Sequence, residues 1–158
     1  MKLQKIVNRL QKLHPKEIDL SLDRINKLCI KLGNPQDKIK TISIVGTNGK
    51  YSTIQALYAI LKEANLKCNI YTSPHIKRIN ERFVFNNQEL NDGELTNLFE
   101  EIEEANNNET ITFFEILTAA YFHKASKYPD NINLIETGLF HRFDATNILK
   151  KNLASIIT

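Results

Sequence analysis

The residues with the clearest chemical potential form a glycine-bounded turn that carries a lysine and is followed by hydroxyl residues. An apolar run at residues 42–45 leads into it, and an amphipathic segment follows it. Two glycines let the backbone turn tightly and point its N–H groups at an anion, and the helix that should begin near Ser52 adds its positive dipole end. The order strand, turn, helix predicts a phosphate-binding loop. We expect its residues to contact a nucleotide such as ATP: Gly46, Thr47, Asn48, Gly49, Lys50, Tyr51 and Ser52.

This turn departs from the common phosphate-loop pattern at two positions. Ile44 stands where the first glycine of that pattern would be, and Tyr51 occupies the hydroxyl position after the lysine. Without its context, the motif is a weak signal, and an ordinary glycine turn with a solvated lysine is the alternative. The β-branched run before it and the helical segment after it favour the phosphate loop.

A magnesium site is expected beside this loop. Ser73 follows a short predicted strand at residues 67–72, and Glu136 ends an apolar run at residues 132–136. The carboxyl ends of parallel strands meet at one edge of a sheet, and Mg²⁺ takes hydroxyl, carboxylate and water ligands. Because Tyr51 replaces the usual hydroxyl ligand, Ser73 and Glu136 are the expected metal ligands, and Ser52 is a further candidate for metal or phosphate.

The remaining candidates are polar residues near other predicted strand ends. Residues 137–147 follow the strand that ends at Glu136, so they should reach the same edge of the sheet. Thr112 and Glu115 have the spacing of a helix capping box. This gives Glu115 a structural explanation at least as good as a catalytic one.

The order of the strands and helices that must position these groups predicts an α/β fold, with a mostly parallel, Rossmann-like sheet and flanking helices. Parallel strands are expected at residues 42–45, 67–72, 132–136 and 153–158, with a right-handed crossover. Residues 82–90 alternate around Asn86 and Asn87 and predict a small hairpin, which we expect to be an excursion from the main sheet. The helix after the loop should bury one face and end near Asn65; that face comprises Ile54, Leu57, Ile60, Leu61 and Ala64.

Three further helices are predicted. Residues 3–13 form an amphipathic pattern with a basic outer face, for which packing on the domain is favoured over a membrane-surface role. A second helix follows Asp19 or Ser21 as its cap and stops at Gly33 and Asn34. Asn91 caps a third, which begins before Leu95.

Length and composition indicate a single globular domain. The net charge of +3 is mild and the basic residues are scattered among acids, so no nucleic-acid partner is expected. No window has the apolar length of a membrane span, and the N-terminus lacks a secretory signal, so no membrane is expected either. Cys29 and Cys68 have no metal-ligand spacing and suit a reducing compartment, which predicts a cytoplasmic protein.

Five ordered motifs resemble the folylpolyglutamate synthase and dihydrofolate synthase family, which belongs to the Mur-type ATP-dependent amide ligases. They are Gly-Thr-Asn-Gly-Lys-x-Ser at residues 46–52, Tyr-Thr-Ser-Pro-His at 71–75, Arg-Ile-Asn-Glu-Arg at 78–82, Phe-Glu-x-Leu-Thr at 114–118 and Glu-x-Gly-Leu-x-x-Arg-x-Asp-Ala-Thr-Asn at 136–147. The resemblance covers essentially the whole chain.

The resemblance implies an enzyme that phosphorylates a carboxylate of dihydropteroate or a reduced folate with ATP and Mg²⁺, after which L-glutamate displaces the phosphate to form an amide. It implies that Lys50 and Glu136 act in catalysis and that Ser73 and Glu136 bind magnesium. It also implies substrate-binding regions around Arg82 and the loop that contains Asp144, Thr146 and Asn147. A monomer is expected for the full-length family.

The chain departs from the family pattern in three residues and in length. Tyr51 replaces a glycine, and Phe140 and His141 replace a glycine pair. Residues 1–158 correspond to the N-terminal part of the ATP-binding domain, without the C-terminal glutamate-binding domain. We therefore expect this polypeptide alone to bind nucleotide weakly and not to form the amide. Alternatives are a small-molecule kinase or NTPase with a phosphate loop, and a non-catalytic nucleotide-binding fragment.

Overall fold

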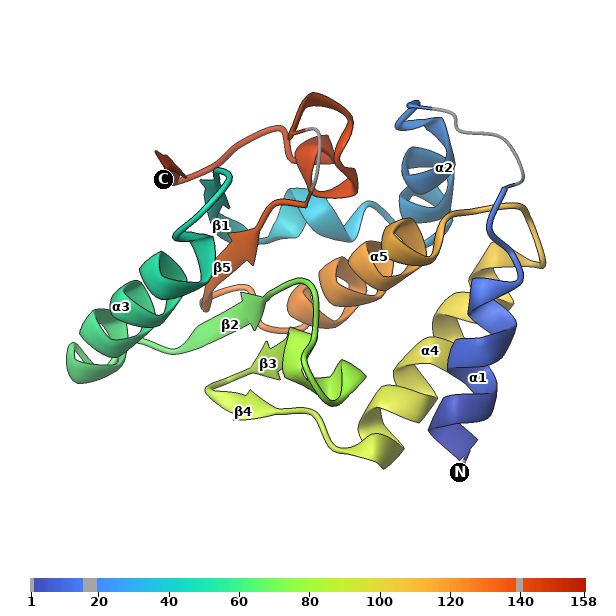
Figure 1. The fold of residues 1–158 in the computed structure, drawn as a ribbon, viewed down its shortest axis with the longest axis horizontal. Coiled ribbons are helices and arrows are strands. Elements are labelled where there is room, and N and C mark those ends of the chain that lie inside the picture. Colours follow the sequence, from blue (N-terminus) through green and yellow to red (C-terminus); the bar gives the residue numbers. More distant parts are fainter. Residues whose placement is uncertain (1, 16–19, 139–140) are drawn as a thin grey trace.

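The computed structural model describes residues 2–15, 20–138 and 141–158. Its centre is a six-stranded sheet with the strand order β4-β3-β2-β5-β1-β6, in which β2, β5, β1 and β6 are mutually parallel (Figure 1). The α/β class and the mostly parallel sheet are thus confirmed. The strands are β1 (Lys40–Val45), β2 (Cys68–Tyr71), β3 (Phe83–Phe85), β4 (Gln88–Glu89), β5 (Ile132–Glu136) and β6 (Ala154–Ile157).

The hairpin of β3 and β4 was predicted correctly as a hairpin, but its expected separation from the main sheet is wrong. β3 pairs antiparallel with β2, and β4 pairs antiparallel with β3, so the hairpin extends the sheet at one edge. Asn86 and Asn87 both have positive φ, 52° and 66°, as the tight turn requires. The hairpin joins the sheet because Phe83 and Phe85 are buried in the main core, which alternation alone does not reveal.

Five α-helices surround the sheet in the part of the chain that is described. They are α1 (Lys2–Gln11), α2 (Asp23–Lys31), α3 (Lys50–Glu63), α4 (Asp92–Asn106) and α5 (Phe113–Ala125). The capping boxes of Asn91 with Glu94 and of Thr112 with Glu115 are both formed. The expected cap of α2 differs: Leu22 occupies the cap position, while the Ser21 hydroxyl accepts the Asp23 N–H at 2.9 Å, and Asp19 lies outside the described residues.

The two faces of the sheet are covered unequally. Helices α1, α2, α4 and α5 build the large core on one face, where Tyr71 and Ile135 point, and α3 covers the other face, where Ile54 packs on Ile70 and Leu134 (Figure 1). Successive strand residues therefore face opposite cores. On α3 the expected apolar face is narrower than predicted, because Ile60 is 66% exposed and only Ile54 is fully buried.

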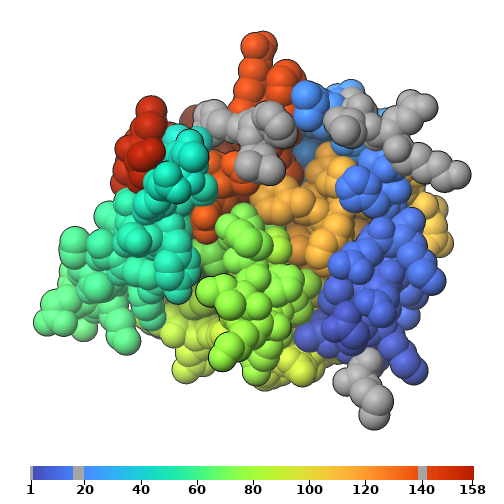
Figure 2. All heavy atoms as spheres, viewed as in Figure 1, coloured from blue at the N-terminus to red at the C-terminus, as the bar shows by residue number. Residues whose placement is uncertain are grey.

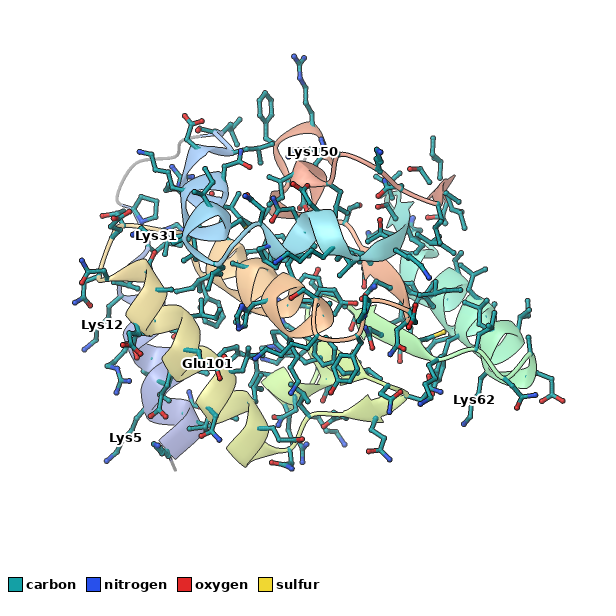
Figure 3. All side chains as sticks on the ribbon, turned by 180° about the vertical axis from the view of Figure 1, so that it is seen from behind. Lys5, Lys12, Lys31, Lys62, Glu101 and Lys150 are labelled. Carbon is teal, nitrogen blue, oxygen red and sulfur yellow. The ribbon has the colours of Figure 1, made fainter. Side chains whose placement is uncertain are left out.

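Helix α1 packs on α4 through Leu3, Ile6, Val7 and Leu10, as its amphipathic pattern predicts. Lys5 and Lys12 point away from the fold (Figure 3), and Arg9 forms an ion pair with Glu103 of α4 at 2.6 Å. The apolar side of α1 is thus used inside the domain. Among the described residues, no helix is long and apolar enough to cross a membrane.

The phosphate-loop region and the hairpin region frame one surface of the molecule. Figure 2 shows the segment from the end of β2 through the hairpin lying between α3 and α1 on this face. Because β1, β2 and β5 run parallel, their carboxyl ends reach the same edge of the sheet, and the candidate site lies there.

Candidate nucleotide and substrate site

The turn after β1 has the geometry of a phosphate loop. Gly49 is the N-cap of α3 with φ 81°, a left-handed conformation that favours glycine, and α3 begins at Lys50. The first N–H groups of α3 have no acceptor within the helix and point toward the loop side, where the helix dipole is positive. The Lys50 Nζ folds back over the turn and donates to the Gly46 carbonyl at 2.8 Å. Thr47, Asn48, Tyr51 and Ser52 complete the predicted loop.

Glu136 and Ser73 converge on this loop from two other strands. Glu136 ends β5, directly beside Ile44 of β1, and its Oε1 lies 3.9 Å from the Lys50 Nζ. Its Oε2 accepts the backbone N–H of Ser73 at 3.1 Å. Burial raises the pKa of the Glu136 carboxyl, whereas the Ser73 N–H, Lys50 and Arg82 oppose this shift. The three strand ends thus gather a lysine, a carboxylate and a hydroxyl residue.

These groups fit a magnesium–nucleotide complex. A single buried carboxylate and a neighbouring serine are hard oxygen donors, and Mg²⁺ usually combines few such protein ligands with water and phosphate oxygens. Among the described residues, no cluster of three or more His, Cys, Asp or Glu side chains is present, so a closed site of the zinc type is not built there. The metal roles of Ser73, Glu136 and Ser52 stay predictions.

Gly46 is required for the approach of β6 as well as for the turn. A Cβ at this position would overlap the hydroxyl and the carbonyl of Thr158, whose N–H donates to the Val45 carbonyl at 2.9 Å. We expect Gly46→Ala to lower the free energy of unfolding by about 1–3 kcal/mol, since β6 or the loop must shift. Urea unfolding followed by circular dichroism measures this.

The matched control is Gly93→Ala in the first turn of α4. A Cβ there meets only the Oδ1 of the capping residue Asn91, at 3.3 Å, so a shift of a few tenths of an ångström accommodates it. If Gly46→Ala lowers the free energy of unfolding no more than Gly93→Ala does, the close approach of Thr158 to Gly46 does not limit which residue can occupy position 46.

A cavity of about 780 Å³ opens beside the Ser73–Pro74 turn. We call it the α2–α5 cavity, because its walls come from the α1–α2 connection, the start of α5 and the segment after β5. Arg24 and Glu115 lie on its wall and form an ion pair at 3.0 Å, which ties α2 to α5. The Glu115 carboxylate also accepts the Thr112 N–H, so its structural role is supported. The cavity is also lined by Ser73, Pro74, Arg82, Phe113, Phe114, Gly138, Phe143, Asp144 and Ala145.

The predicted substrate residues divide into two groups. Arg82 and Asp144 line the α2–α5 cavity, whereas Thr146 and Asn147 do not. Asp144 is buried and caps a 3-10 helix, Ala145–Ile148, by accepting the N–H and hydroxyl of Thr146. The Asn147 amide donates to the Arg142 carbonyl at 3.2 Å. Thr146 and Asn147 therefore stabilise the loop that presents Asp144.

A second opening, the hairpin groove, lies between α3 and the β3–β4 hairpin and has a volume of about 730 Å³. Tyr51 is 59% exposed and lines it together with Gln55, Ser73 and Glu136. The ring that replaces the family glycine thus faces the groove beside the expected metal ligands. Of the other two departures, Phe140 lies outside the described residues, and the backbone of His141 begins a 3-10 helix, His141–Phe143.

Sequence reasoning missed the contribution of the α1–α2 connection to the cavity. His14, Pro15, Leu20 and Ser21 of this connection line it together with Arg24 of α2. Of these residues, only Ser21 was singled out from the sequence, as a candidate helix cap. The sequence shows only that a loop connects two helices there, and this does not reveal which part of the fold the loop residues will contact. Phe113 was visible only as part of a capping pattern.

Comparison with known proteins gives consistent relatives. No family model matches the sequence. The dihydrofolate synthase/folylpolyglutamate synthase of Haemophilus influenzae is 40% identical over 147 residues, which are 93% of this chain and 33% of that protein. The protein of the same name from Escherichia coli is 36% identical over 93% of this chain and 35% of its own length. The chain thus spans about a third of the curated relatives it matches.

Solved structures agree with the sequence relatives. E. coli FolC in complex with DHPP and ADP has a TM-score of 0.90 and 34% identity, over 99% of this chain and 37% of that chain. The bifunctional folylpolyglutamate synthase/dihydrofolate synthase of Yersinia pestis complexed with AMPPNP and Mn ion has a TM-score of 0.89 and 33% identity, over 98% of this chain and 38% of that chain. In sequence and in fold, the chain therefore matches a segment that makes up about a third of the length of these dihydrofolate synthase/folylpolyglutamate synthases, as its motifs indicate.

Proposed function

We propose that this chain supplies the phosphate-binding and acceptor-binding part of an ATP-dependent ligase that joins L-glutamate to dihydropteroate or a reduced folate. One observation carries the proposal. Lys50, Glu136 and Ser73 meet at one sheet edge, and the α2–α5 cavity opens at the same Ser73–Pro74 turn. A phosphoryl donor on the loop and an acid in the cavity would therefore meet beside Ser73.

The reaction proceeds in two displacements. An oxygen of the acceptor carboxylate attacks the γ-phosphorus of ATP, and ADP leaves, which gives an acyl phosphate. The amino group of L-glutamate then attacks the acyl carbon, inorganic phosphate leaves, and the amine loses a proton to give the amide. Lys50 and the loop N–H groups would hold the nucleotide phosphates, so the protein contributes mainly position and charge. Magnesium, when bound by Glu136 and Ser73, would neutralise the terminal phosphates.

The α2–α5 cavity suits an aromatic acid. Phe113, Phe114 and Phe143 supply ring surfaces for a flat pterin and benzoyl system, and Arg82 supplies a cation for a carboxylate. The positive charge of Arg82 acts on the Glu136 carboxyl and opposes the rise in its pKa. The acid end of the substrate would therefore point toward Ser73 and Arg82, and the ring end toward the aromatic wall.

Pteroate, a pterin joined to p-aminobenzoate with a free carboxylate, tests the acceptor site. The chain has no tryptophan, so pterin fluorescence can be followed without indole background. We expect saturable binding of pteroate to the chain, and Phe143→Ala should weaken it about 5- to 10-fold through the loss of ring contact. Phe143 is 44% exposed, so its removal should leave the melting temperature nearly unchanged.

Ile60→Ala is the matched control, since Ile60 is 66% exposed on α3 and does not line the cavity. Equal pteroate affinity in the Phe143 and Ile60 variants, or no binding by the wild-type chain, would contradict the proposed acceptor site.

Glutamate dependence separates the ligase from the alternatives. In an assay of ADP release by the full product of the coding sequence, with ATP, Mg²⁺ and dihydropteroate, the ligase requires L-glutamate for turnover. Phosphorylation of a small molecule without glutamate would favour the kinase, and no turnover would favour the non-catalytic fragment. The cytoplasmic location, the monomeric state and the choice between dihydropteroate and folate stay predictions.

A further inference from the structure

His75 forms a direct contact with Arg82, a residue that lines the α2–α5 cavity. The Arg82 Nε donates to the His75 Nδ1 at 2.9 Å. Both side chains are partly buried, and Arg82 lines the cavity while His75 does not. This contact involves no residue of the predicted phosphate loop and none of the expected magnesium ligands.

The contact fixes the chemical form of both partners. A guanidinium has only donors, so the Nδ1 that accepts from it carries no proton, and the ring proton of a neutral imidazole must be on Nε2. The bond also occupies the Nε of Arg82, so a ligand would meet the two terminal nitrogens of the guanidinium, which also interacts with the buried Tyr71 hydroxyl. These nitrogens present a planar, two-pronged donor that matches a carboxylate.

The backbone that carries His75 is itself held. The Glu81 carboxylate accepts the N–H groups of Ile76, Lys77 and Arg78 at 2.7, 3.0 and 2.9 Å. The Thr72 N–H donates to the Arg82 carbonyl at 3.4 Å, which closes the segment between the two residues. His75 is therefore a fixed acceptor, and the orientation of Arg82 follows from it.

We propose that His75 is a positioning residue that orients the Arg82 guanidinium so that its terminal nitrogens meet the carboxylate of the acceptor in the α2–α5 cavity. This inference rests on the proposed function. It adds a residue that acts through Arg82 and does not itself touch the substrate. Without His75, Arg82 keeps its charge and loses its preferred orientation, so recognition of a carboxylate should suffer more than binding of the ring system.

The test compares two ligands and a double-variant cycle on this chain. His75→Leu removes the acceptor, and His75→Asn retains one, because the asparagine Oδ1 can lie close to the place of Nδ1. We expect His75→Leu to weaken pteroate binding about tenfold and to weaken the uncharged amide of pteroate less than twofold, while His75→Asn restores most of the pteroate affinity. In an Arg82→Ala background, His75→Leu should have no further effect. His123→Leu, on α5 beside Glu101, is the histidine control and should change neither affinity.

The outcomes are separable. If wild-type protein binds neither pteroate nor its amide, the proposed function fails, and this inference fails with it. If wild-type protein binds pteroate and His75→Leu binds it equally well, only the positioning role is overturned. An equal loss for pteroate and its amide, or an additive loss with Arg82→Ala, would also overturn it, because both results indicate a general structural role.

Discussion

Replacing Glu136 by glutamine is expected to weaken the magnesium-dependent part of nucleotide binding by roughly 10- to 100-fold. Glu136 is the carboxylate that lies within 3.9 Å of Lys50 and accepts the Ser73 N–H, at the junction of the three strand ends. Glutamine retains the size of the side chain but loses the charge that a hard cation requires. An NMR titration of the chain with AMPPNP, with and without Mg²⁺, measures the effect even when binding is weak.

Glu136→Gln should remain folded, and its stability, compared with that of wild type at two pH values, provides an independent control on the state of Glu136. Because burial raises the pKa of Glu136, the folded chain binds more protons than the unfolded chain between the unfolded and folded pKa values. The free energy of unfolding therefore falls as pH rises through that interval. Glutamine does not titrate, so the stability of wild type relative to Glu136→Gln should be lower at pH 7.5 than at pH 4, as measured by melting temperatures.

Two results would contradict this account of Glu136. The first is an undiminished magnesium effect on AMPPNP binding in Glu136→Gln. The second is a wild-type chain whose stability relative to the variant rises between pH 4 and pH 7.5, since that would require a lowered pKa.

Replacing Asn133 by leucine is expected to lower the free energy of unfolding by about 3–5 kcal/mol, a large share of a typical domain's stability. The fully buried Asn133 side chain accepts from the Asn69 amide at 3.0 Å and the Tyr121 hydroxyl at 2.9 Å, and it donates to the Lys40 carbonyl at 3.0 Å. Leucine fills the space but leaves the Asn69 amide, the Tyr121 hydroxyl and the carbonyls of Lys40 and Asn131 without that partner. Urea unfolding monitored by circular dichroism measures the change.

Asn97→Leu is the matched control, because Asn97 lies exposed on α4 and should change stability by less than about 0.5 kcal/mol. A loss below about 1 kcal/mol for Asn133→Leu would indicate that the network rearranges to satisfy its members. The network also includes the amide of Asn131 and the backbone N–H of Asn86, both of which donate to the Asn69 Oδ1. It therefore links β5, β2, α5 and the hairpin turn at the edge of the sheet opposite the site.

Local patterns in the sequence were sufficient to predict most helices and strands and the glycine–lysine turn between β1 and α3. The glycine–lysine turn, the strand before it and the helix after it are encoded within a few residues, and the structure has them in that order. The two capping boxes were equally readable, because a cap depends on residues only three positions apart. The proximity of Glu136 and Ser73 to the loop was also predictable, since parallel strands place their carboxyl ends at one edge of the sheet.

Long-range pairing could not be predicted in the same way. The strand order places β5 between β1 and β2, although β2 follows β1 in the chain, and it attaches the hairpin to β2. Nothing in the alternation of residues 82–90 specifies which strand they will join. The same limit hid the buried asparagines, because asparagine is uncommon in strands and its role here depends on partners in other elements. Asn133 contacts Tyr121, Asn69 and Lys40, which lie 12, 64 and 93 positions away.

The sequence by itself determined that a strand, a glycine–lysine turn and a helix would form and which side chains would lie at the strand ends, because these features arise from neighbouring residues. Only the tertiary structure decided that the α1–α2 connection closes the cavity, that Tyr51 faces the hairpin groove, and that His75 holds Arg82. Such contacts depend on how separate elements pack, and packing is set by the whole set of buried surfaces rather than by any local pattern.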